Sequence, residues 1–511
     1  MGSPALRGNV TPVDMSDVQG LAAYGYSKLT EARFLLLRIR DAAAARAWIG
    51  TAPLSTAECK PAAPETALQV AFTAAGLRAL GVPESAMAGF SPEFLKGMAG
   101  EENRSRRLGD TGKSDPAGWL WGGPGKGADL AVLLYAKENL EAWLRTVQKG
   151  PWRTAFETVA ALETSDMGGR EPFGFVDGIS QPEFDWKRER IAQGTTVDYD
   201  NRIALGELLL GYPNEYGKYT ERPLVAPTED PGDELLSAED QPGRKDLGKN
   251  GTYLVMRTLD QDVRGFWQYL DKAAIASPKE RYSLGAAMVG RTLDGAPLIP
   301  ASAQKIGGIT EKPGEPRNSF VYDNDPRGTQ CPFGAHIRRA NPRNADMFGH
   351  PSGLISGLSS RLAIPRPGFH DDLIASTRFH RMLRRGREYG VPITPEEALQ
   401  PAPPREAPRG LQFACLCANI SRQFEFVQNA WLMSTKFNGL TEESDPLLGN
   451  RAAVGDSTAT ANFSIPREGK MARRLNGVPQ FITVRGGAYF FMPGLRALRY
   501  FARSGNSGSA R

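Results

Sequence analysis

Short hydrophobic runs, each followed by an amphipathic segment, recur along the chain. In Ala32–Arg40 the apolar side chains occupy both faces of a predicted strand, and Asp41 can cap a helix that ends at Gly50. Further strands are predicted at Thr66–Phe72 and Asp129–Tyr135, each with a helix after it. Because the connections are long and irregular, this pattern favours an α+β arrangement with helices on antiparallel sheets over a doubly wound parallel sheet.

The same order of elements returns in the second half of the chain. Gly251–Thr258 is a predicted strand, and Asp260 can cap a helix over Gln261–Ala274. Gly410–Cys417 is a further strand, followed by an amphipathic helix over Ser421–Met433. The two halves therefore share one strand–helix pattern, which predicts a duplicated α+β architecture.

Near its end the sequence predicts a hairpin and a last helix. Two apolar runs, Phe481–Arg485 and Ala488–Met492, flank the pair Gly486-Gly487, which is typical of a tight turn between strands. The segment Gly494–Phe501 then has the pattern of a helix.

A stretch rich in Pro, Gly, Asp and Glu separates the two halves. It lacks any hydrophobic period and is typical of a long loop or linker. We therefore predict an N-terminal domain over 18–200, a linker over 201–250 and a C-terminal domain over 251–505.

Composition narrows the class of protein without defining it. Of the 511 residues, 41% are hydrophobic and 23% are charged, as in a folded globular chain. A net charge of +5 is mild at this length and does not indicate a nucleic-acid or membrane partner. No apolar segment has the length of a secretory leader or a membrane span. The four cysteines are too few for a disulfide framework, so we expect a reducing cytoplasm.

The four histidines begin with His336, in the segment CPFGAHIRRANPR, which ends at Arg343. An imidazole is the usual proximal ligand of a haem that reacts with oxygen or peroxide, and arginines suit carboxylates such as haem propionates. On its own, a histidine in a surface loop is the more common case.

Two other stretches carry candidate chemistry. Asp177 stands between glycines in the aromatic segment EPFGFVDGISQP, where it is either a turn residue or an acid/base in a dry pocket. Arg384 belongs to the basic stretch TRFHRMLRRGREYG, whose aromatic residues are too few to favour nucleic-acid binding over a solvated helix end.

Taken together, these stretches resemble the dye-decolorising peroxidases. The family pattern Gly-x-x-Asp-Gly is matched by Gly174–Gly178, the His-Ile-Arg segment ending Asn-Pro-Arg by His336–Arg343, and Leu-Arg-Arg-Gly by Leu383–Gly386. The order of the three motifs agrees, and the resemblance extends from about Val18 to the last predicted hairpin.

The resemblance implies two ferredoxin-like α+β domains, with haem b held mainly by the C-terminal one. It implies that His336 is the proximal iron ligand, Asp177 the distal acid/base and Arg384 the distal arginine, with Gly178 of the Asp177 motif among the cofactor-binding residues. Arg343 would contact a haem propionate. Hydrogen peroxide would be the acceptor, and dyes, phenols or other small aromatic molecules the donors, with a homo-oligomer possible.

Two features depart from the compact members of the family. The stretch from 345 to 377 is an insertion, which suggests a longer-chain member. The residue that orients the proximal imidazole also differs, because many members have an Asp where this chain has Asn419. Glu425 is the acidic alternative and our preferred partner for His336.

Two other classes of function stay open on the sequence alone. A non-haem metal hydrolase could use the cluster His350, His370, Asp371, Asp372 and His380, although its spacing matches no familiar ligand pattern. A haem-binding or haem-delivery protein without turnover would have no need of a placed Asp177 and Arg384.

Overall fold

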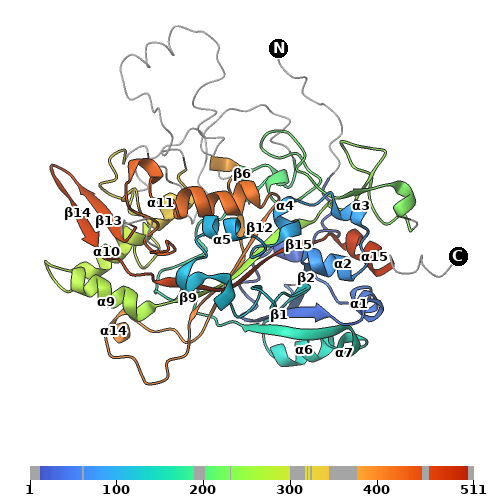
Figure 1. Cartoon of the computed structure of the whole chain (residues 1–511), viewed down its shortest axis with the longest axis horizontal. Coiled ribbons are helices and arrows are strands. Elements are labelled where there is room, and N and C mark those ends of the chain that lie inside the picture. The colour runs from blue at the N-terminus through green and yellow to red at the C-terminus, as the bar shows by residue number, and fades with distance from the viewer. Residues whose placement is uncertain are drawn as a thin grey trace, which may run out of the picture.

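The computed structural model describes residues 12–59, 63–188, 202–230, 232–299, 317–318, 320, 322, 325–343, 377–451 and 460–503. Within these residues, one nine-stranded antiparallel sheet runs through the molecule (Figure 1). Its strands are β1 Glu31–Ile39, β2 Thr66–Phe72, β3 Leu130–Ala136, β4 Phe156–Glu163, β9 Thr252–Gln261, β10 Leu383–Arg384, β11 Arg387–Tyr389, β12 Gly410–Cys417 and β15 Ile482–Met492.

The strand order repeats once within the sheet. It reads β10-β12-β9-β15 in the C-terminal half and β2-β3-β1-β4 in the N-terminal half, with β11 also paired to β12. In both halves the first strand in sequence lies between the third and the fourth, which is the order of a ferredoxin-like unit. The predicted α+β class and the duplication are confirmed.

Two contacts join the halves. β15 pairs with β2 through Phe491 and Phe72. At the other end, Ser165, just after β4, donates its backbone N–H to the carbonyl of Glu388 in β11 at 2.7 Å. Each contact links the fourth strand of one half to the second strand of the other, so the two outer edges of the sheet are also connected.

Alternation along the strands builds two apolar layers. In β1, Leu35 and Leu37 pack with Trp48 of the helical layer, whereas Phe34 and Leu36 face an inner core that both halves share. This two-residue period is what the sequence of β1 predicts.

Helices cover the outer faces and lie at both ends of the molecule. α9 and α10 lie on the left in Figure 1, and α1, α2, α6 and α7 on the right. The α-helices are α1 Ala42–Ile49, α2 Ala74–Ala79, α3 Glu84–Met87, α4 Pro92–Lys96, α5 Glu102–Leu108, α6 Leu140–Val147, α7 Trp152–Ala155, α9 Val263–Ala273, α10 Glu280–Val289, α11 His336–Ala340, α14 Pro395–Ala398 and α15 Leu495–Arg503. The predicted helix after β12 forms two π-helical segments, η7 Ser421–Glu425 and η8 Val427–Leu432.

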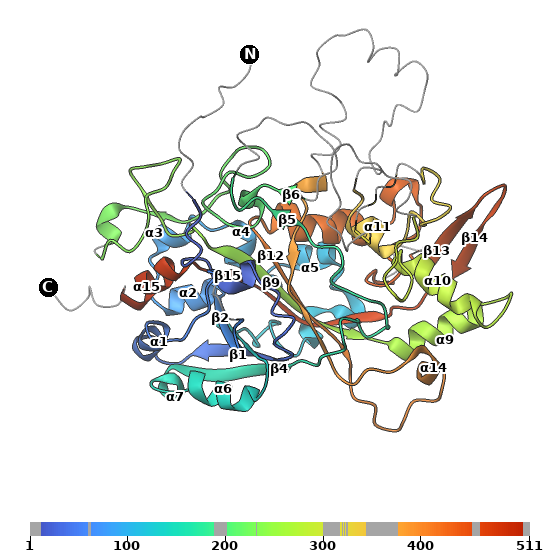
Figure 2. The same ribbon diagram turned by 180° about the vertical axis from the view of Figure 1, so that it is seen from behind.

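The remaining strands are short pairs outside the main sheet. They are β5 Glu183–Phe184 with β6 Arg202–Ile203, β7 Leu224–Val225 with β8 Lys245–Asp246, and β13 Asn462–Arg467 with β14 Lys470–Asn476. The β13–β14 hairpin projects from the end of the molecule that carries α9 and α10 (Figure 2).

Two local predictions are wrong. The helix after β9 is capped by Asp262, which accepts the N–H of Gly265 at 2.8 Å, because the strand runs on through Gln261. Asp260, the predicted cap, instead accepts a hydrogen bond from Arg485 at 2.7 Å.

The predicted C-terminal hairpin is a single long strand. β15 continues through Gly486 and Gly487, with an irregularity between Val484 and Gly486. A Cβ on Gly486 would lie 2.4 Å from Nε1 of Trp121. The two glycines therefore admit neighbouring side chains against the strand and do not make a turn.

The stretch expected to be a linker has few regular elements but is well packed. Leu208, Leu209 and Leu210 are fully buried, and Glu207 forms an ion pair with Arg422 at 2.7 Å. In the described part of this stretch the chain contributes to the core. The domain boundaries stay a prediction.

The first and last described segments lie against each other. The backbone carbonyl of Asp17 accepts the N–H of Leu495 at 2.8 Å, and its carboxylate accepts that of Arg496 at 2.6 Å. These bonds satisfy the free donors at the start of α15.

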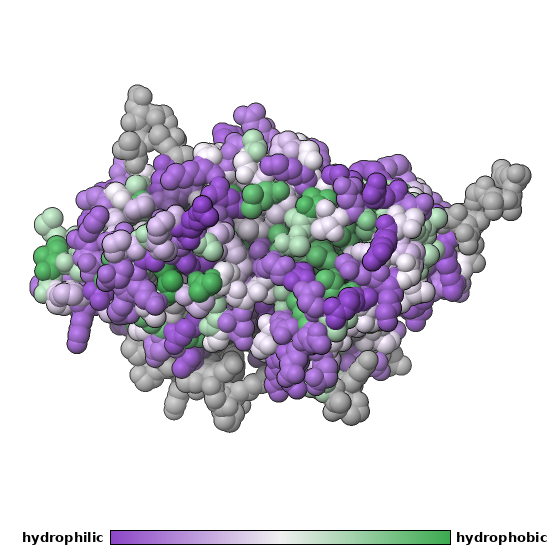
Figure 3. All heavy atoms as spheres, turned by 90° about the horizontal axis from the view of Figure 1, so that it is seen from below, coloured by the Kyte–Doolittle hydropathy of each residue, from purple (hydrophilic) through white to green (hydrophobic). Residues whose placement is uncertain are grey.

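Apolar side chains at the surface are scattered. On the face seen in Figure 3 they form small patches separated by hydrophilic atoms. None of the described helices has the length and hydropathy needed to cross a membrane.

Candidate active site

His336 begins α11, and its ring lines a cavity of about 260 Å³. Nδ1 lies 2.9 Å from Oδ2 of Asp445, a carboxylate that is fully buried. The other oxygen of Asp445 accepts the N–H groups of Leu447 at 2.9 Å and Leu448 at 2.8 Å. An anionic acceptor on Nδ1 favours the tautomer with its proton there, which leaves Nε2 with a free lone pair.

Each member of this pair stabilises the charged form of the other. Burial lowers the pKa of His336, but the charge and hydrogen bond of Asp445 outweigh it and raise the pKa above its usual value. Burial raises the pKa of Asp445, and His336 outweighs that effect and lowers it. The imidazole is therefore held in one orientation and made electron-rich, as in a metal ligand supported by a carboxylate.

Asp177 and Arg384 line the same cavity as His336. Oδ1 of Asp177 lies 3.0 Å from Nη1 of Arg384 and accepts the N–H of Gly178 at 2.6 Å. The two side chains are 35% and 37% exposed, so both are reachable from the cavity. Burial raises the pKa of Asp177, but Arg384 and the N–H of Gly178 outweigh it and lower that pKa below 3.8.

Local bonds fix the loop that carries Asp177. The carboxylate of Glu171 accepts the N–H groups of Phe173 and Phe175, each at 3.0 Å. Gln181 accepts the N–H of Arg384 at 3.1 Å and donates to its carbonyl at 3.2 Å. Both polar atoms of the Gln181 amide thus bind the backbone of β10 and tie the loop to that strand.

Positive φ angles explain the glycines of this motif. Gly174 has φ of 101° and Gly178 has φ of 78°, in the region that side chains with a Cβ rarely adopt. The tight path brings the N–H of Gly178 back onto Asp177. Gly178 thus acts through its backbone.

Arg343 also lines the cavity and is 2% exposed. Nη1 donates to the carbonyl groups of Asn318 at 2.8 Å and Phe320 at 2.6 Å. The guanidinium carbon lies 3.8 Å from the centre of the Phe320 ring. Arg343 is therefore in the cavity wall, as a residue that contacts a cofactor must be.

Our preferred partner for His336 is wrong. Glu425 is buried and has other partners: it forms an ion pair with Arg104 at 2.8 Å and accepts a hydrogen bond from the hydroxyl of Tyr489 at 2.8 Å. Asn419, the alternative, accepts the N–H of Arg422 at 2.8 Å. The carboxylate behind the imidazole comes instead from the segment after η8.

Sequence reasoning missed Asp445 because 109 residues separate it from His336. The segment Glu442-Glu443-Ser444-Asp445-Pro446 does hold a signal, since it places three carboxylates close together after an apolar helix. Nothing in the local pattern tells which of the three carboxylates contacts His336.

Only His380 of the cluster proposed for a metal hydrolase lies within the described residues. His350, His370, Asp371 and Asp372 lie outside the described residues, as does nearly all of the insertion at 345–377. His380 is described; its ring stacks on Phe426 at 3.7 Å between centres. In the described part of the chain no group of three or more His, Cys, Asp and Glu side chains could hold a metal ion.

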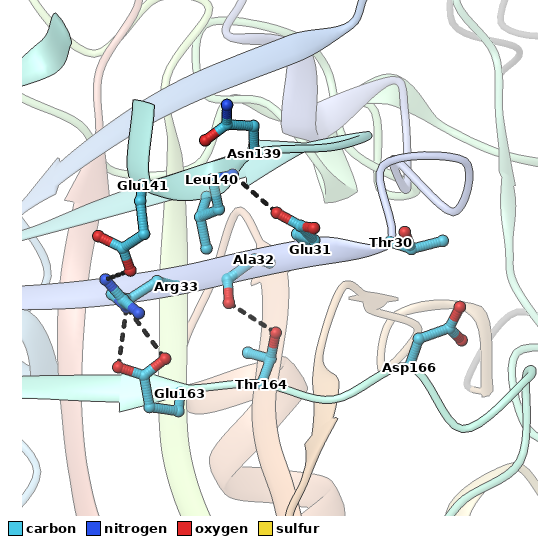
Figure 4. Close-up of a pocket in the computed structure, with 10 residues that line it drawn as sticks. All are labelled: Thr30, Glu31, Ala32, Arg33, Asn139, Leu140, Glu141, Glu163, Thr164 and Asp166. Carbon is cyan, nitrogen blue, oxygen red and sulfur yellow. Dashed lines mark hydrogen bonds and ion pairs between the residues drawn. The ribbon is translucent and has the colours of Figure 1, made fainter. Parts of the chain in front are cut away.

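A second hollow, of about 530 Å³, lies beside β1 and β4 (Figure 4). Its lining contains neither His336 nor the Asp177–Arg384 pair. Arg33 lies between Glu141 and Glu163, each 2.8 Å from it, and the two carboxylates are more than half exposed. The charge of Arg33 is thus already paired with solvent-exposed carboxylates. We therefore take the cavity at His336 as the candidate active site.

This cavity fits a haem better than a bare metal ion. His336 and His380 both line the cavity, but no group of three or more His, Cys, Asp and Glu side chains in the described residues could hold an ion, whereas a porphyrin supplies four ligands of its own. The walls hold many apolar side chains, among them Phe175, Ile179, Val427 and Leu432, and they also carry arginines. Apolar walls suit the porphyrin faces, and arginines suit its carboxylates.

Comparison with known proteins agrees with this chemistry. No protein-family model matches the chain. The multifunctional dye peroxidase DyP2 of an Amycolatopsis species is 31% identical over 459 residues, covering 84% of this chain and 81% of the relative. The dye-decolorizing peroxidase msp1 of Mycetinis scorodonius is 28% identical, covering 95% of this chain and 87% of the relative.

The fold has close counterparts among solved structures. The DyP-type peroxidase of an Anabaena species superposes with a TM-score of 0.67 at 24% identity, covering 95% of this chain and 94% of that one. Fold, motif order and extended similarity to the Amycolatopsis enzyme agree, and the chain belongs to the dye-decolorising peroxidases, a family of haem-dependent enzymes that act on peroxide.

Proposed function

We propose that the cavity binds haem b, with Nε2 of His336 as the protein's ligand to the iron. The support is the tautomer that Asp445 favours for His336, together with the apolar walls of the cavity. When bound, the haem supplies a ferric iron that binds and activates peroxide. Asp445 makes His336 a stronger electron donor, which favours the higher oxidation states that peroxidase turnover needs.

Asp177 is the proposed acid/base for peroxide. Its lowered pKa keeps it ionised at neutral pH, so the carboxylate can take a proton from one peroxide oxygen. It can then deliver that proton to the other oxygen, which leaves as water when the O–O bond breaks. Gly178 keeps the carboxylate in place by its N–H.

Arg384 is the proposed electrostatic partner in that step. Its guanidinium lies 3.0 Å from Asp177 and reaches the same cavity. Negative charge develops on the departing oxygen as the O–O bond breaks, and a fixed cation stabilises it. Arg343 is proposed to bind a haem propionate, since it is a buried cation in the cavity wall.

Electrons for the second half of the cycle are proposed to come from dyes, phenols or other small aromatic molecules. The curated relatives carry dye peroxidase names, and their similarity to this chain supports donors of that class. A homo-oligomer stays a prediction. We also propose a cytoplasmic location, because Cys59, Cys331, Cys415 and Cys417 are all free thiols.

The single observation that carries the proposal is that His336 and the Asp177–Arg384 pair line one cavity although they come from different parts of the chain. The test is reconstitution of the purified protein with haem b. We expect a Soret band that shifts when cyanide is added and whose position changes when one equivalent of peroxide is added.

Asp177→Asn should bind haem normally but react with peroxide roughly 10²–10⁴-fold more slowly, because the base is lost. Glu157→Gln, an exposed carboxylate on β4, is the matched control and should react at the parental rate. Parental reactivity of Asp177→Asn would show that Asp177 is not the acid/base, and a missing Soret band would reject haem binding itself.

A further inference from the structure

Arg291 is a buried cation in the cavity wall that has no role in the proposed reaction with peroxide. It follows α10 through Gly290, whose φ is 96° and where a Cβ would lie 2.4 Å from Cγ1 of Ile337. This close approach sets Arg291 near the residue after His336. Its side chain is 4% exposed and lines the same cavity as His336 and Asp177.

No described carboxylate forms an ion pair with Arg291. Nη1 donates to the backbone carbonyls of Gly295 at 2.9 Å and Arg317 at 2.8 Å. Burial, followed by repulsion from Arg343, lowers the pKa of Arg291 to about 10. A cation buried beside another cation, with only neutral acceptors, destabilises the folded protein unless an anion joins it.

Other arginines of the cavity wall differ in this respect. Arg384 has Asp177 at 3.0 Å, and Arg257 forms an ion pair with the buried Asp110. Arg291 instead shares the ring of Phe320 with Arg343. Their guanidinium carbons lie 5.5 Å and 3.8 Å from the ring centre. Two guanidinium groups therefore lie against one ring.

We propose that Arg291 is a second anchor for the haem carboxylates, so that Arg291 and Arg343 together hold the propionate edge of the cofactor. This proposal rests on the proposed function, because it assigns the anion to the haem. A charge-assisted bond to a carboxylate would neutralise the buried cation. The buried charge of Arg291 is thus suited to the cofactor and is electrostatically unfavourable without it.

The test compares haem b with its dimethyl ester, which has the same iron and ring but no propionate charge. Affinities are measured by absorbance titration of the apo-protein. The parent should prefer haem b, and Arg291→Met should reduce that preference roughly tenfold, as expected for loss of one charge-assisted bond. Arg291→Lys, which keeps the charge, should retain most of it.

Thermal unfolding of the apo-proteins gives a second readout, which needs no haem. Arg291→Met should be at least as stable as the parent, because a buried charge without a counter-ion is removed. If Arg291 had a purely structural role, Arg291→Met would be less stable than the parent. Arg317→Met, which removes an exposed positive charge nearby, is the control and should match the parent in both measurements.

The outcomes separate this proposal from the proposed function. If the parent binds neither porphyrin, haem binding itself fails. If the parent binds both and Arg291→Met keeps the parental preference, only the anchor is overturned. Should Arg291→Met not fold, Arg291→Gln keeps a donor for the two carbonyls without the charge, and a parental preference in that variant would equally overturn the anchor.

Discussion

Two aspartates position the nitrogen-bearing side chains of the candidate site. Asp445 holds the ring of His336, and Asp177 pairs with Arg384. Asp445 is sealed from solvent, whereas Asp177 faces the cavity. The difference in burial therefore suits Asp445 to orienting His336 and Asp177 to exchanging a proton.

The Asp177–Arg384 pair should set the acid limit of the enzyme. With the pKa of Asp177 held below 3.8 by Arg384, the rate constant for peroxide should fall only as the pH falls through that low value. Arg384→Met removes the cation and leaves burial, which raises the pKa of Asp177. The acid limb of kcat/KM for peroxide should therefore move to higher pH, with Arg40→Met, an exposed control, unchanged. A limb that stays in place would mean that another group titrates.

Asp445→Asn should weaken His336 as a ligand. Without the carboxylate, burial is the largest remaining influence on the imidazole, so the pKa of His336 in the apo-protein should fall. The holoenzyme should react with peroxide roughly 10–100-fold more slowly, the usual effect of losing such a partner. NMR titration of the His336 ring measures the first effect and stopped-flow absorbance the second.

Glu425→Gln is the matched comparison for Asp445→Asn, because it neutralises the carboxylate that the sequence favoured. Its partners are Arg104 and Tyr489, so the pKa of His336 should stay at the parental value. A fall as large as that in Asp445→Asn would contradict the assignment of Asp445.

Asp177, Arg384, His336 and Arg343 could be predicted because each stands in a short motif whose neighbours are also distinctive. Asp445 and Arg291 could not, since their roles depend on contacts that the chain makes far from them in sequence. Local patterns therefore located side chains that line one cavity, whereas the contact between Asp445 and His336 required three-dimensional proximity.

At the level of elements, the strands carry the clearest sequence signal. β2 and β12 begin and end where their apolar runs do, because both faces of each are largely buried. The break expected within β15 failed because glycine has two meanings in a strand: a turn, or room for a neighbour. Only the tertiary contact with Trp121 distinguishes them.

Gly486→Ala should therefore destabilise the fold by about 1–3 kcal/mol, because the added methyl group overlaps the ring of Trp121. Gly127→Ala is the control, since a Cβ there would meet nothing within 4 Å. Urea unfolding of the two variants measures the difference. Equal stability would show that Trp121 can move aside without cost.

At the level of the whole molecule, the two ferredoxin-like halves share one inner core. Phe34 and Leu36 of the first half and Leu254 and Met256 of the second belong to the same buried cluster. The site also needs both halves, because Asp177 precedes β9 in the chain while His336 and Arg384 follow it. A half on its own would therefore lack both a closed core and a complete site.

Unfolding should accordingly be one cooperative transition. Phe491 is fully buried at the β15–β2 contact, and Phe491→Ala should cost about 3–5 kcal/mol. Hydrogen exchange should then speed up in β3 and β12 together. Met471→Ala, at a side chain that is 86% exposed, should change neither strand. Separate unfolding of the two halves would instead support independent domains.

The contact between Asp17 and the start of α15 has a consequence for how the chain is ordered. Since the first and last described segments meet, a short connection between them would close the polypeptide into a ring. That ring could be opened at an exposed turn, such as Glu468-Gly469 between β13 and β14, without separating any strand of the main sheet from its neighbour. The packing of the main sheet therefore does not require the chain to begin and end where it does.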